Sequence, residues 1–399
     1  MKKTVKDIDI KGKKVIMRVD FNVPLDKETN SKITDTTRVD AAMPTIEYIL
    51  SQGASLILMS HLGRPKGEAN PKYSLRPVYD YLKTKLPNNK VIFANDCIGE
   101  EVKKTAGSLN AGDVLLLENL RYHAEEEKND ANFSKQLADL ADVYVNDAFG
   151  TAHRAHASTA GIVAAKPSMP AVAGFLMEKE IKYLGDAVAE PKRPFVAIIG
   201  GAKVSSKISV LKSLLNKVDT LIVVGGMAYT FFKAKGYEIG TSLCEDDYIQ
   251  TAKEIMDKAK ELNKTLYLPI DNVVADKFDN DANKKIVDCN AIPSGWMGMD
   301  VGDKTLKELE NILKNAKTIV WNGPLGVFEM SNFAKGTFET AKFIANSGAV
   351  SIIGGGDSVS AVNKSGVADK MTHISTGGGA SLEFLEGIEL PGIKVLQDK

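Results

Sequence analysis

Cysteine is scarce in this sequence and widely scattered. The 399 residues contain three cysteines, Cys97, Cys244 and Cys289, and no two of them form a CxxC pair. An odd, scattered set argues against a disulfide framework and against a zinc framework built on cysteine pairs. It favours a reducing compartment, so we expect the protein to be cytoplasmic.

Long hydrophobic runs and an excess of one charge are also missing. The only early apolar run, residues 15–17, is too short for the core of a signal peptide, and no run approaches the length of a membrane span. Lys and Arg number 51, and so do Asp and Glu, which gives a net charge of zero. Nothing global therefore indicates a nucleic-acid or membrane partner.

Four common catalytic or nucleotide-binding patterns are absent. The chain has no GxxxxGK[ST] motif, which excludes an ordinary P-loop NTPase. It also has no GxGxxG motif after a predicted strand, which weakens the case for a nicotinamide-dependent dehydrogenase. GxSxG and HExxH are missing as well.

Arginine is absent from the second half. None of the seven arginines lies beyond Arg193, whereas 22 of the 33 glycines do. A bias toward lysine would explain why arginine is rare but not why it is segregated. We interpret the halves as chemically different: arginine forks can hold an anion in the first, and backbone amides and lysines can hold phosphates in the second.

The chain is long enough for two domains, and both halves alternate short apolar strands with helices. This pattern predicts an α/β fold made of two doubly wound, parallel-sheet (Rossmann-like) domains. A helix at 178–188 followed by Pro191-Lys-Arg-Pro194 places the boundary near Glu190 and suggests a hinge. The predicted strands are 14–19, 55–60, 91–94, 114–117 and 143–146 in the first domain, and 195–199, 221–224, 265–268, 318–321, 350–353 and 372–375 in the second.

Arginines follow the predicted strands of the first half. Arg64, Arg121 and Arg154 lie in loops just after strand ends, and Arg38 opens a helix. Because parallel strands bring their carboxyl ends to one edge, these side chains should converge there. A single loop arginine, or a histidine such as His61, is more often structural. Four arginines in equivalent positions favour a site for a polyanion.

Glycine turns follow the predicted strands of the second half. Gly354-Gly-Gly-Asp357 joins a buried strand to a helix, a geometry that presents free N–H groups and a positive dipole to a phosphate. Asp357 adds a carboxylate of the kind that shares Mg²⁺ with a nucleotide. Lys203 and Lys207 follow another such turn, and they would share a helix face if both were helical. An ordinary glycine-rich turn with a helix cap is the plainer alternative.

Six motifs, in order along nearly the whole chain, resemble the phosphoglycerate kinase family. They are Arg18-Val-Asp-Phe-Asn-Val-Pro24, Ser60-His-Leu-Gly-Arg-Pro65, Glu118-Asn-Leu-Arg121, Gly200-Gly-Ala-Lys-Val204, Trp321-Asn-Gly-Pro-Leu-Gly326 and Gly354-Gly-Gly-Asp357. The resemblance implies reversible transfer of a phosphoryl group between ATP and the carboxylate of 3-phosphoglycerate, a step of glycolysis, with closure about the hinge. It also implies a monomer. Ser358 departs from the threonine of many members but keeps the hydroxyl group.

The resemblance implies site residues in both domains. Domain one, residues 1–189 with the tail 391–399 packed back on it, would hold the acceptor through Asp20, Phe21, Asn22, Arg38, His61, Leu62, Gly63, Arg64, Arg121 and Arg154. Domain two, residues 190–390, would hold the nucleotide, with Mg²⁺ on Asp357, through Gly201, Ala202, Lys203, Lys207, Gly226, Asn322, Pro324, Gly326, Glu329, Gly355, Gly356, Asp357 and Ser358. Catalytic roles at the transferring phosphoryl group are implied for Arg38, Lys203, Lys207, Gly355 and Gly378.

Two other classes of function remain as alternatives at this stage. A nucleotide-linked dehydrogenase could share the architecture, although its glycine fingerprint is missing. A two-lobed binding protein could close on an anionic metabolite without chemistry, although such proteins are commonly exported and no export signal is seen. Turnover of ATP would distinguish a kinase from both.

Overall fold

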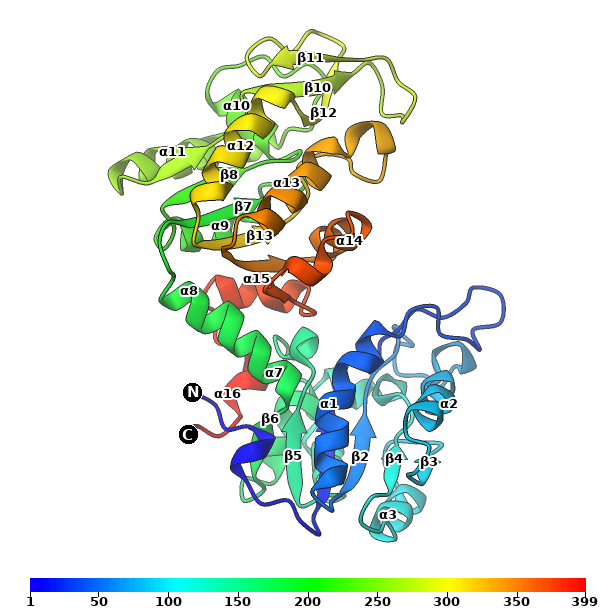
Figure 1. Cartoon of the computed structure of the whole chain (residues 1–399). Helices are drawn as coiled ribbons and strands as arrows, with labels where there is room; N and C mark the ends of the chain where they lie inside the picture. The colour runs from blue at the N-terminus through cyan, green and yellow to red at the C-terminus, as the bar shows by residue number, and fades with distance from the viewer. The chain divides into compact units, whose positions relative to one another are not determined.

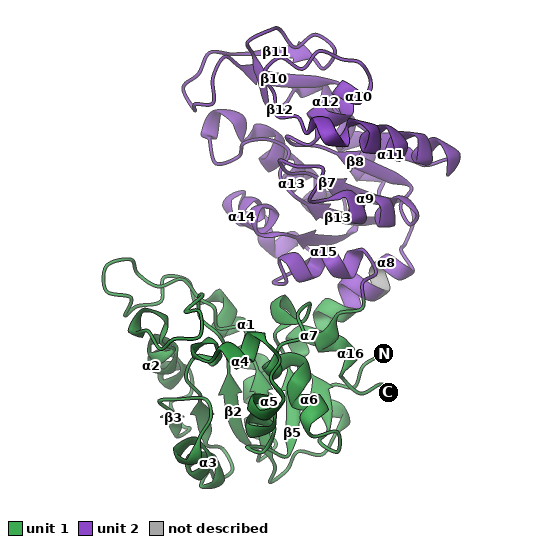
Figure 2. Ribbon diagram, turned by 180° about the vertical axis from the view of Figure 1, so that it is seen from behind, with its two compact units in different colours: residues 1–181, 389–399 green, residues 182–388 purple. Residues whose placement is uncertain are grey.

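Two parallel sheets organise the chain in the computed structural model, which describes residues 1–185 and 188–399 (Figure 2). The first sheet belongs to a unit formed by residues 1–181 and 389–399, and the second to a unit formed by residues 182–388. The predicted α/β fold with two parallel-sheet domains is confirmed. No helix of the described residues is both long and apolar enough to cross a membrane.

The sheet of the first unit has the strand order β3-β4-β2-β1-β5-β6, and every neighbouring pair is parallel (Figure 1). Its central strands are apolar on both faces because helices cover both sides. The short sixth strand was not predicted. The strands are β1 (Lys14–Arg18), β2 (Ser55–Met59), β3 (Val91–Phe93), β4 (Val114–Leu116), β5 (Val143–Asn146) and β6 (Ala171–Ala173).

Helices lie on both faces of this first sheet. α1 (Thr37–Ser51) and α7 (Phe175–Glu180) pack together on one face, and α5 (Ala131–Ala138) and α6 (Ile162–Ala165) pack on the other (Figures 1 and 2). The remaining helices of this unit are α2 (Arg76–Lys85), α3 (Glu100–Gly107), α4 (Ala124–Glu127) and α16 (Pro391–Lys394).

The helix predicted at 178–188 is not a single regular helix. It begins earlier, as α7, and continues from Ile181 as a π-helical turn. Residues 186 and 187 of the predicted helix lie outside the described residues. The boundary between the two units falls at Ile181, where the wider turn begins. A π-turn widens the helix locally and weakens its hydrogen-bond ladder, which suits a point of bending.

The C-terminal segment completes the first unit. The backbone of Gly392 donates to Ala152, and the side-chain amide of Asn146 donates to the carbonyl of Gly392. Gln397 donates to Ala171 in β6, and Lys2 pairs with Asp398 across an antiparallel bridge. Both ends of the chain therefore lie beside the β6 edge (Figure 1).

The second unit has a sheet of order β15-β14-β13-β7-β8-β9, again parallel throughout. From β7 the chain adds β8 and then β9 on one side, and later adds β13, β14 and β15 on the other side of β7. The strand order therefore reverses between β7 and β13, where ligands bind in sheets of this type. The strands are β7 (Phe195–Ile199), β8 (Thr220–Val223), β9 (Thr265–Tyr267), β13 (Thr318–Asn322), β14 (Val350–Gly354) and β15 (His373–Ile374).

The helices of the second unit also form two layers. α12 and α13 pack on one face of the sheet, and α9 lies with α11 on the other (Figures 1 and 2). Lys203 and Lys207 do not share a helix face, because α9 begins only after Lys207. The helices are α9 (Ile208–Leu215), α10 (Ala228–Ala234), α11 (Ile249–Glu261), α12 (Asp303–Asn315), α13 (Lys335–Asn346), α14 (Gly356–Lys364) and α15 (Gly379–Leu385).

A small antiparallel sheet in this unit was not predicted. It has the order β11-β10-β12 and consists of β10 (Asp271–Ala275), β11 (Lys284–Asp288) and β12 (Met297–Val301). Its outer strand, β11, is almost wholly exposed and mostly polar, so it lacks the apolar run that reveals a buried strand.

Asp147, directly after β5, is a buried carboxyl group that holds the start of α7. Its Oδ1 accepts hydrogen bonds from the backbone N–H groups of Leu176 and Met177, at 2.9 and 3.0 Å. A Cβ on Gly174 would lie 2.3 Å from Asp147 Cγ, so only glycine allows this approach. Burial raises the pKa of Asp147 to about 6, although hydrogen bonds from the Thr45 side chain and from these two N–H groups oppose the shift.

This pKa predicts a pH-dependent stability. The folded-state pKa lies above the ordinary value of 3.8, so the folded state binds the proton more tightly. The contribution of Asp147 to the free energy of unfolding is full below about pH 4 and falls by about 3 kcal/mol as the pH rises through 6. Asp147→Asn does not titrate and should lack this decrease. Urea midpoints of both proteins between pH 4 and 7.5 test it, and a difference that stays constant with pH would contradict it.

Candidate functional site

The carboxyl edge of the first sheet gathers most of the predicted acceptor residues. Asp20 and Asn22 follow β1, His61 and Gly63 follow β2, and Arg121 lies in the turn after β4. Arg38 reaches this edge from the first turn of α1, where its Nη1 lies 2.8 Å from Asp20 Oδ2. The strand register therefore brings together side chains that are up to a hundred residues apart in sequence.

The Gly63 peptide connects two of these loops. Its N–H donates to Asn22 Oδ1 at 2.9 Å, and its carbonyl accepts from Arg121 Nη1 at 3.0 Å. Gly63 has φ +61°, and a Cβ there would lie 2.4 Å from the ring of Tyr73, so this position needs glycine. The peptide thus fixes the Asn22 amide and the Arg121 guanidinium relative to one another.

His61 is held neutral and in one tautomer. Burial and the positive charges of Arg18 and Arg121 hold its pKa well below the usual range. Arg18 Nη2 lies 3.2 Å from His61 Nδ1, and a guanidinium can only donate, so Nδ1 accepts and the proton sits on Nε2. His61 can therefore donate one hydrogen bond from Nε2. Arg18 itself is fully buried and was not among the predicted site residues.

The arginines at this edge raise each other's electrostatic free energy. Burial lowers the pKa of Arg121, and the charges of Arg18 and Arg154 lower it further, although Glu127 opposes them. Burial and the charges of Arg121 and Arg18 lower the pKa of His156 to about 4. Such a concentration of positive charge favours the binding of an anion.

The other predicted acceptor residues differ in what they can offer. Arg64 and Arg154 are exposed, and Arg154 Nε donates to His153 at 3.1 Å. Phe21 and Leu62 are buried in the hydrophobic core of the first unit, so only their backbones can face a ligand. For Phe21 and Leu62, the sequence motif therefore reflects the conformation of the loop rather than a side-chain contact with a ligand.

In the second unit, glycine turns line a cavity of about 360 Å³ at the point where the strand order reverses. A Cβ on Gly200 would lie 2.2 Å from the carbonyl oxygen of Pro324, and one on Gly323 would lie 2.1 Å from that of Gly200. The turns after β7 and β13 thus pack backbone against backbone. Predicted residues that line this cavity are Gly201, Ala202, Lys207, Asn322, Pro324, Gly355, Gly356, Asp357, Ser358 and Gly378.

Lys207 and Asn322 meet inside this cavity. Lys207 Nζ donates to Asn322 Oδ1 at 2.6 Å, and Asn322 Nδ2 is buried without a hydrogen-bond partner among the described residues. Burial lowers the pKa of Lys207, and the carboxylates of Asp357 and Glu386 oppose that shift. An ammonium group and an unpaired amide N–H thus point to a ligand that accepts hydrogen bonds and carries negative charge.

Not every predicted nucleotide residue contributes a side chain to this cavity. The hydroxyl of Ser358 accepts a hydrogen bond from the Gly323 N–H at 2.6 Å, which ties the start of α14 to the turn after β13. Lys203 is exposed and lines neither this cavity nor the neighbouring one. Its predicted role therefore depends on movement of its long side chain.

A second cavity, of about 550 Å³, adjoins the first and is largely apolar. Gly201, Ala202, Pro324 and Asp357 border both cavities. Gly226, Gly326 and Glu329 were predicted here, but most of the apolar lining was not: Tyr229, Leu243, Phe278, Met297, Met299, Leu325 and Val327. These side chains come from α10, from loops and from the unpredicted antiparallel sheet. Two of them are exposed apolar side chains, Leu243 at 59% and Phe278 at 64%, and only the structure reveals that exposure.

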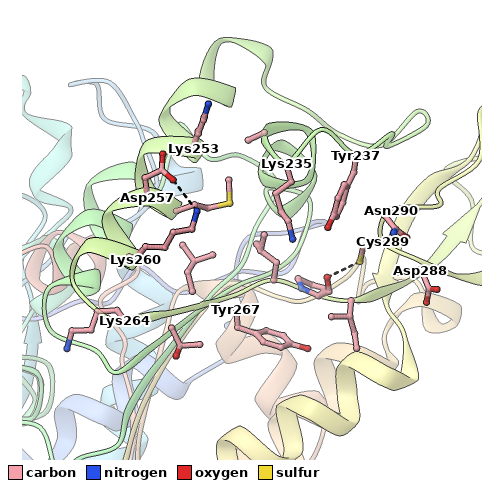
Figure 3. A pocket seen from close by; sticks show the side chains of 18 of the residues that line it. Lys235, Tyr237, Lys253, Asp257, Lys260, Lys264, Tyr267, Asp288, Cys289 and Asn290 are labelled. Atoms are coloured by element: carbon pink, nitrogen blue, oxygen red, sulfur yellow. Dashed lines mark hydrogen bonds and ion pairs between the residues drawn. The ribbon is translucent and has the colours of Figure 1, made fainter.

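A third hollow, of about 910 Å³, lies beside β9 and α11 and shares no lining residue with the other two (Figure 3). Several lysines border it, and Lys260 pairs with Asp257 at 3.3 Å. None of the predicted site residues lines it, so it is not part of the candidate site.

Known proteins of one family are similar to this chain over its whole length. Residues 5–388 match the family model described as phosphoglycerate kinase. The chain is 58% identical to the phosphoglycerate kinase of Clostridium botulinum over 400 residues, which cover all of this chain and 99% of the relative. It is also 58% identical to the cytosolic phosphoglycerate kinase 3 of Arabidopsis thaliana, over 99% of this chain and 98% of that protein.

Solved structures give the same result. The phosphoglycerate kinase of Coxiella burnetii superposes with a TM-score of 0.90 at 41% identity, and that of Pyrococcus horikoshii with 0.81 at 34%. Each match covers 99% of this chain and 98% of the other. The matches therefore span both sheets, and the chain belongs to the phosphoglycerate kinase family.

Proposed function

We propose that this chain transfers a phosphoryl group reversibly between ATP and the carboxylate of 3-phosphoglycerate, forming ADP and 1,3-bisphosphoglycerate. The arginine-rich edge of the first unit binds the acceptor, and the glycine-lined cavities of the second bind the nucleotide. The protein acts as a monomer in the cytoplasm. Because the two sets of residues belong to different units, we propose that the units close on each other during the reaction.

The observation that carries this proposal is the charge concentrated around neutral His61. Arg38, Arg121 and the exposed Arg64 can form paired hydrogen bonds with phosphate and carboxylate oxygens, and His61 can donate from Nε2. A ligand with negative charge at both ends, such as 3-phosphoglycerate, matches this set of donors. A neutral metabolite would leave the arginine charges unbalanced.

The proposed reaction does not need acid–base catalysis by the protein. The attacking carboxylate of the acceptor is ionised at neutral pH, since such groups titrate near ~4, so no general base is required. Catalysis then depends on placing the two oxygens in line and stabilising the charge that spreads over the transferring phosphoryl group. Lys203, Lys207 and Arg38 are the cations proposed for that task, with the backbone N–H groups near Gly355 and Gly378.

Mg²⁺ fits the residues of the second unit. Asp357 is exposed in the first turn of α14 and borders both cavities, so its carboxylate can reach an ion held by nucleotide phosphates. Magnesium prefers oxygen ligands and is usually bound by one or two carboxylates together with phosphates and water. When bound, it neutralises phosphate charge, while Lys207 and the glycine turns orient the nucleotide.

The first test is phosphoryl transfer itself. Purified protein is mixed with ATP, Mg²⁺ and 3-phosphoglycerate, the acyl phosphate is trapped with hydroxylamine, and ADP is measured. We expect ADP to form only when both the acid and Mg²⁺ are present. If both ligands bind but no ADP appears, the scaffold lacks the activity and the protein is a binding protein.

Lys203→Ala should lower kcat by roughly a hundredfold or more, because a charge that acts on the transition state would be lost. The KM values should change much less. Lys212→Ala is the matched control, since Lys212 is an exposed lysine of α9 that lines neither cavity. Steady-state kinetics of both variants test this catalytic role of Lys203. A near-normal kcat for Lys203→Ala would contradict it.

Arg64→Ala should raise the KM for 3-phosphoglycerate by roughly tenfold to a hundredfold, the effect of losing a hydrogen bond to a charged group. The KM for ATP should change little, because Arg64 lies in the other unit from the nucleotide cavities. Arg76→Ala is the control: Arg76 is also exposed, but it lies over the rings of Tyr79 and Phe93 in α2 and β3. A larger effect on ATP than on the acid would contradict the assignment.

A further inference from the structure

Three side chains with metal-binding chemistry lie together in the first unit, apart from the residues assigned above. Asp96 and Cys97 belong to the loop after β3, and His123 follows the 3₁₀ turn Leu120–Tyr122. A carboxylate oxygen, the Cys97 sulfur and a ring nitrogen of His123 all lie within 4.8 Å of one another. No motif in the sequence indicated this cluster, because His123 lies far along the chain from the adjacent Asp96 and Cys97.

The cluster is held in place from several sides. Asp96 Oδ1 lies 2.7 Å from His123 Nε2 and also accepts the Cys97 backbone N–H at 2.6 Å. The His123 ring packs against Phe133, with ring centroids 5.3 Å apart. Cys97 is fully buried beneath the other two, Asp96 is exposed and His123 is half-buried. An ion bound here would have three protein ligands and one side open to water.

The local charge favours a cation. Cys97 experiences the negative charges of Asp96 and Glu126, and His123 those of Asp96 and Glu125. Glu126 also faces Arg18 and Arg121, so Asp96 and Glu125 supply most of the uncompensated negative charge.

We propose that Asp96, Cys97 and His123 form a binding site for a divalent cation of the zinc class, with water as the fourth ligand. Thiolate sulfur, imidazole nitrogen and carboxylate oxygen are the ligand types of Zn²⁺, whereas Mg²⁺ prefers oxygen alone. Tetrahedral zinc at its usual bond lengths separates its ligand atoms by about 3.6 Å. Side-chain movements of about 1 Å would bring the three atoms to that spacing.

Binding at this site involves no redox change. The Cys97 S–H bond breaks as the sulfur–metal bond forms, and the thiol proton passes to the solvent. The metal replaces the hydrogen bond between Asp96 and His123. It would also join the loop after β3 to the end of the turn that carries Arg121, two residues before His123. The three ligands lie outside the proposed acceptor and nucleotide residues, so binding can be measured without turnover.

Cobalt provides the direct test, because Co²⁺ occupies zinc sites and a thiolate ligand gives it a near-ultraviolet charge-transfer band. The whole protein, reduced and freed of metal with a chelator, is titrated with Co²⁺. We expect the band to rise to one equivalent and to disappear when Zn²⁺ is added. Absence of the band with cobalt in excess would overturn the proposal, and so would binding that shows no thiolate band.

Variants identify the ligands. Cys97→Ser should abolish the band, and His123→Gln should weaken cobalt binding by roughly tenfold or more. Cys244→Ser is the matched control, since Cys244 is a free cysteine of the other unit and should leave the band unchanged. If Cys97→Ser fails to fold, His123→Gln carries the test, because its side chain is half-buried. Unchanged cobalt affinity in a folded His123→Gln variant would then contradict the site.

Discussion

Parallel pairing forces the carboxyl ends of six strands to one edge of each sheet, and both candidate binding surfaces depend on that constraint. In the first unit it gathers the loops that carry Asn22, His61 and Arg121. In the second it packs the turn after β7 against the turn after β13, so closely that a single Cβ on Gly200 or Gly323 would clash. A register shift in either sheet would separate these groups and break the contacts between their loops.

The two edges offer different groups for holding negative charge. The first concentrates guanidinium groups and supports them with buried polar contacts such as that between Arg18 and His61. The second offers backbone N–H groups, one partly buried lysine and Asn322 Nδ2, which has no hydrogen-bond partner in the part of the chain that the structure describes. Guanidinium forks suit a small acid with two charged ends, whereas glycine turns allow a polyphosphate to approach the backbone itself. The segregation of arginine and glycine along the chain reflects this division.

The alternation of strands and helices was predicted well from the sequence, because apolar runs and glycine turns are local signals. β7 and β5 were predicted to the residue, and the strand ends identified Arg121 and Gly355 as site candidates. Three features of the structure could not be predicted from local sequence patterns. The apolar wall with Tyr229 and Phe278 depends on a helix, a strand and loops that tertiary packing brings together. The polar edge strand β11 has no burial pattern. Arg18 looks like the end of a strand, and only its burial against His61 reveals its role.

The C-terminal segment has a consequence for biosynthesis. Residues 389–399 belong to the first unit and contact Ala152 and β6, yet they follow the whole of the second unit in the chain. A ribosome therefore releases the complete sequence of the second unit before the last part of the first. During translation the β6 edge lacks the contact made by Gln397, and the loop at Ala152 lacks the contact made by Gly392. The unit whose synthesis starts first is thus the last to be completed, and until then the surface that residues 389–399 cover stays open to solvent.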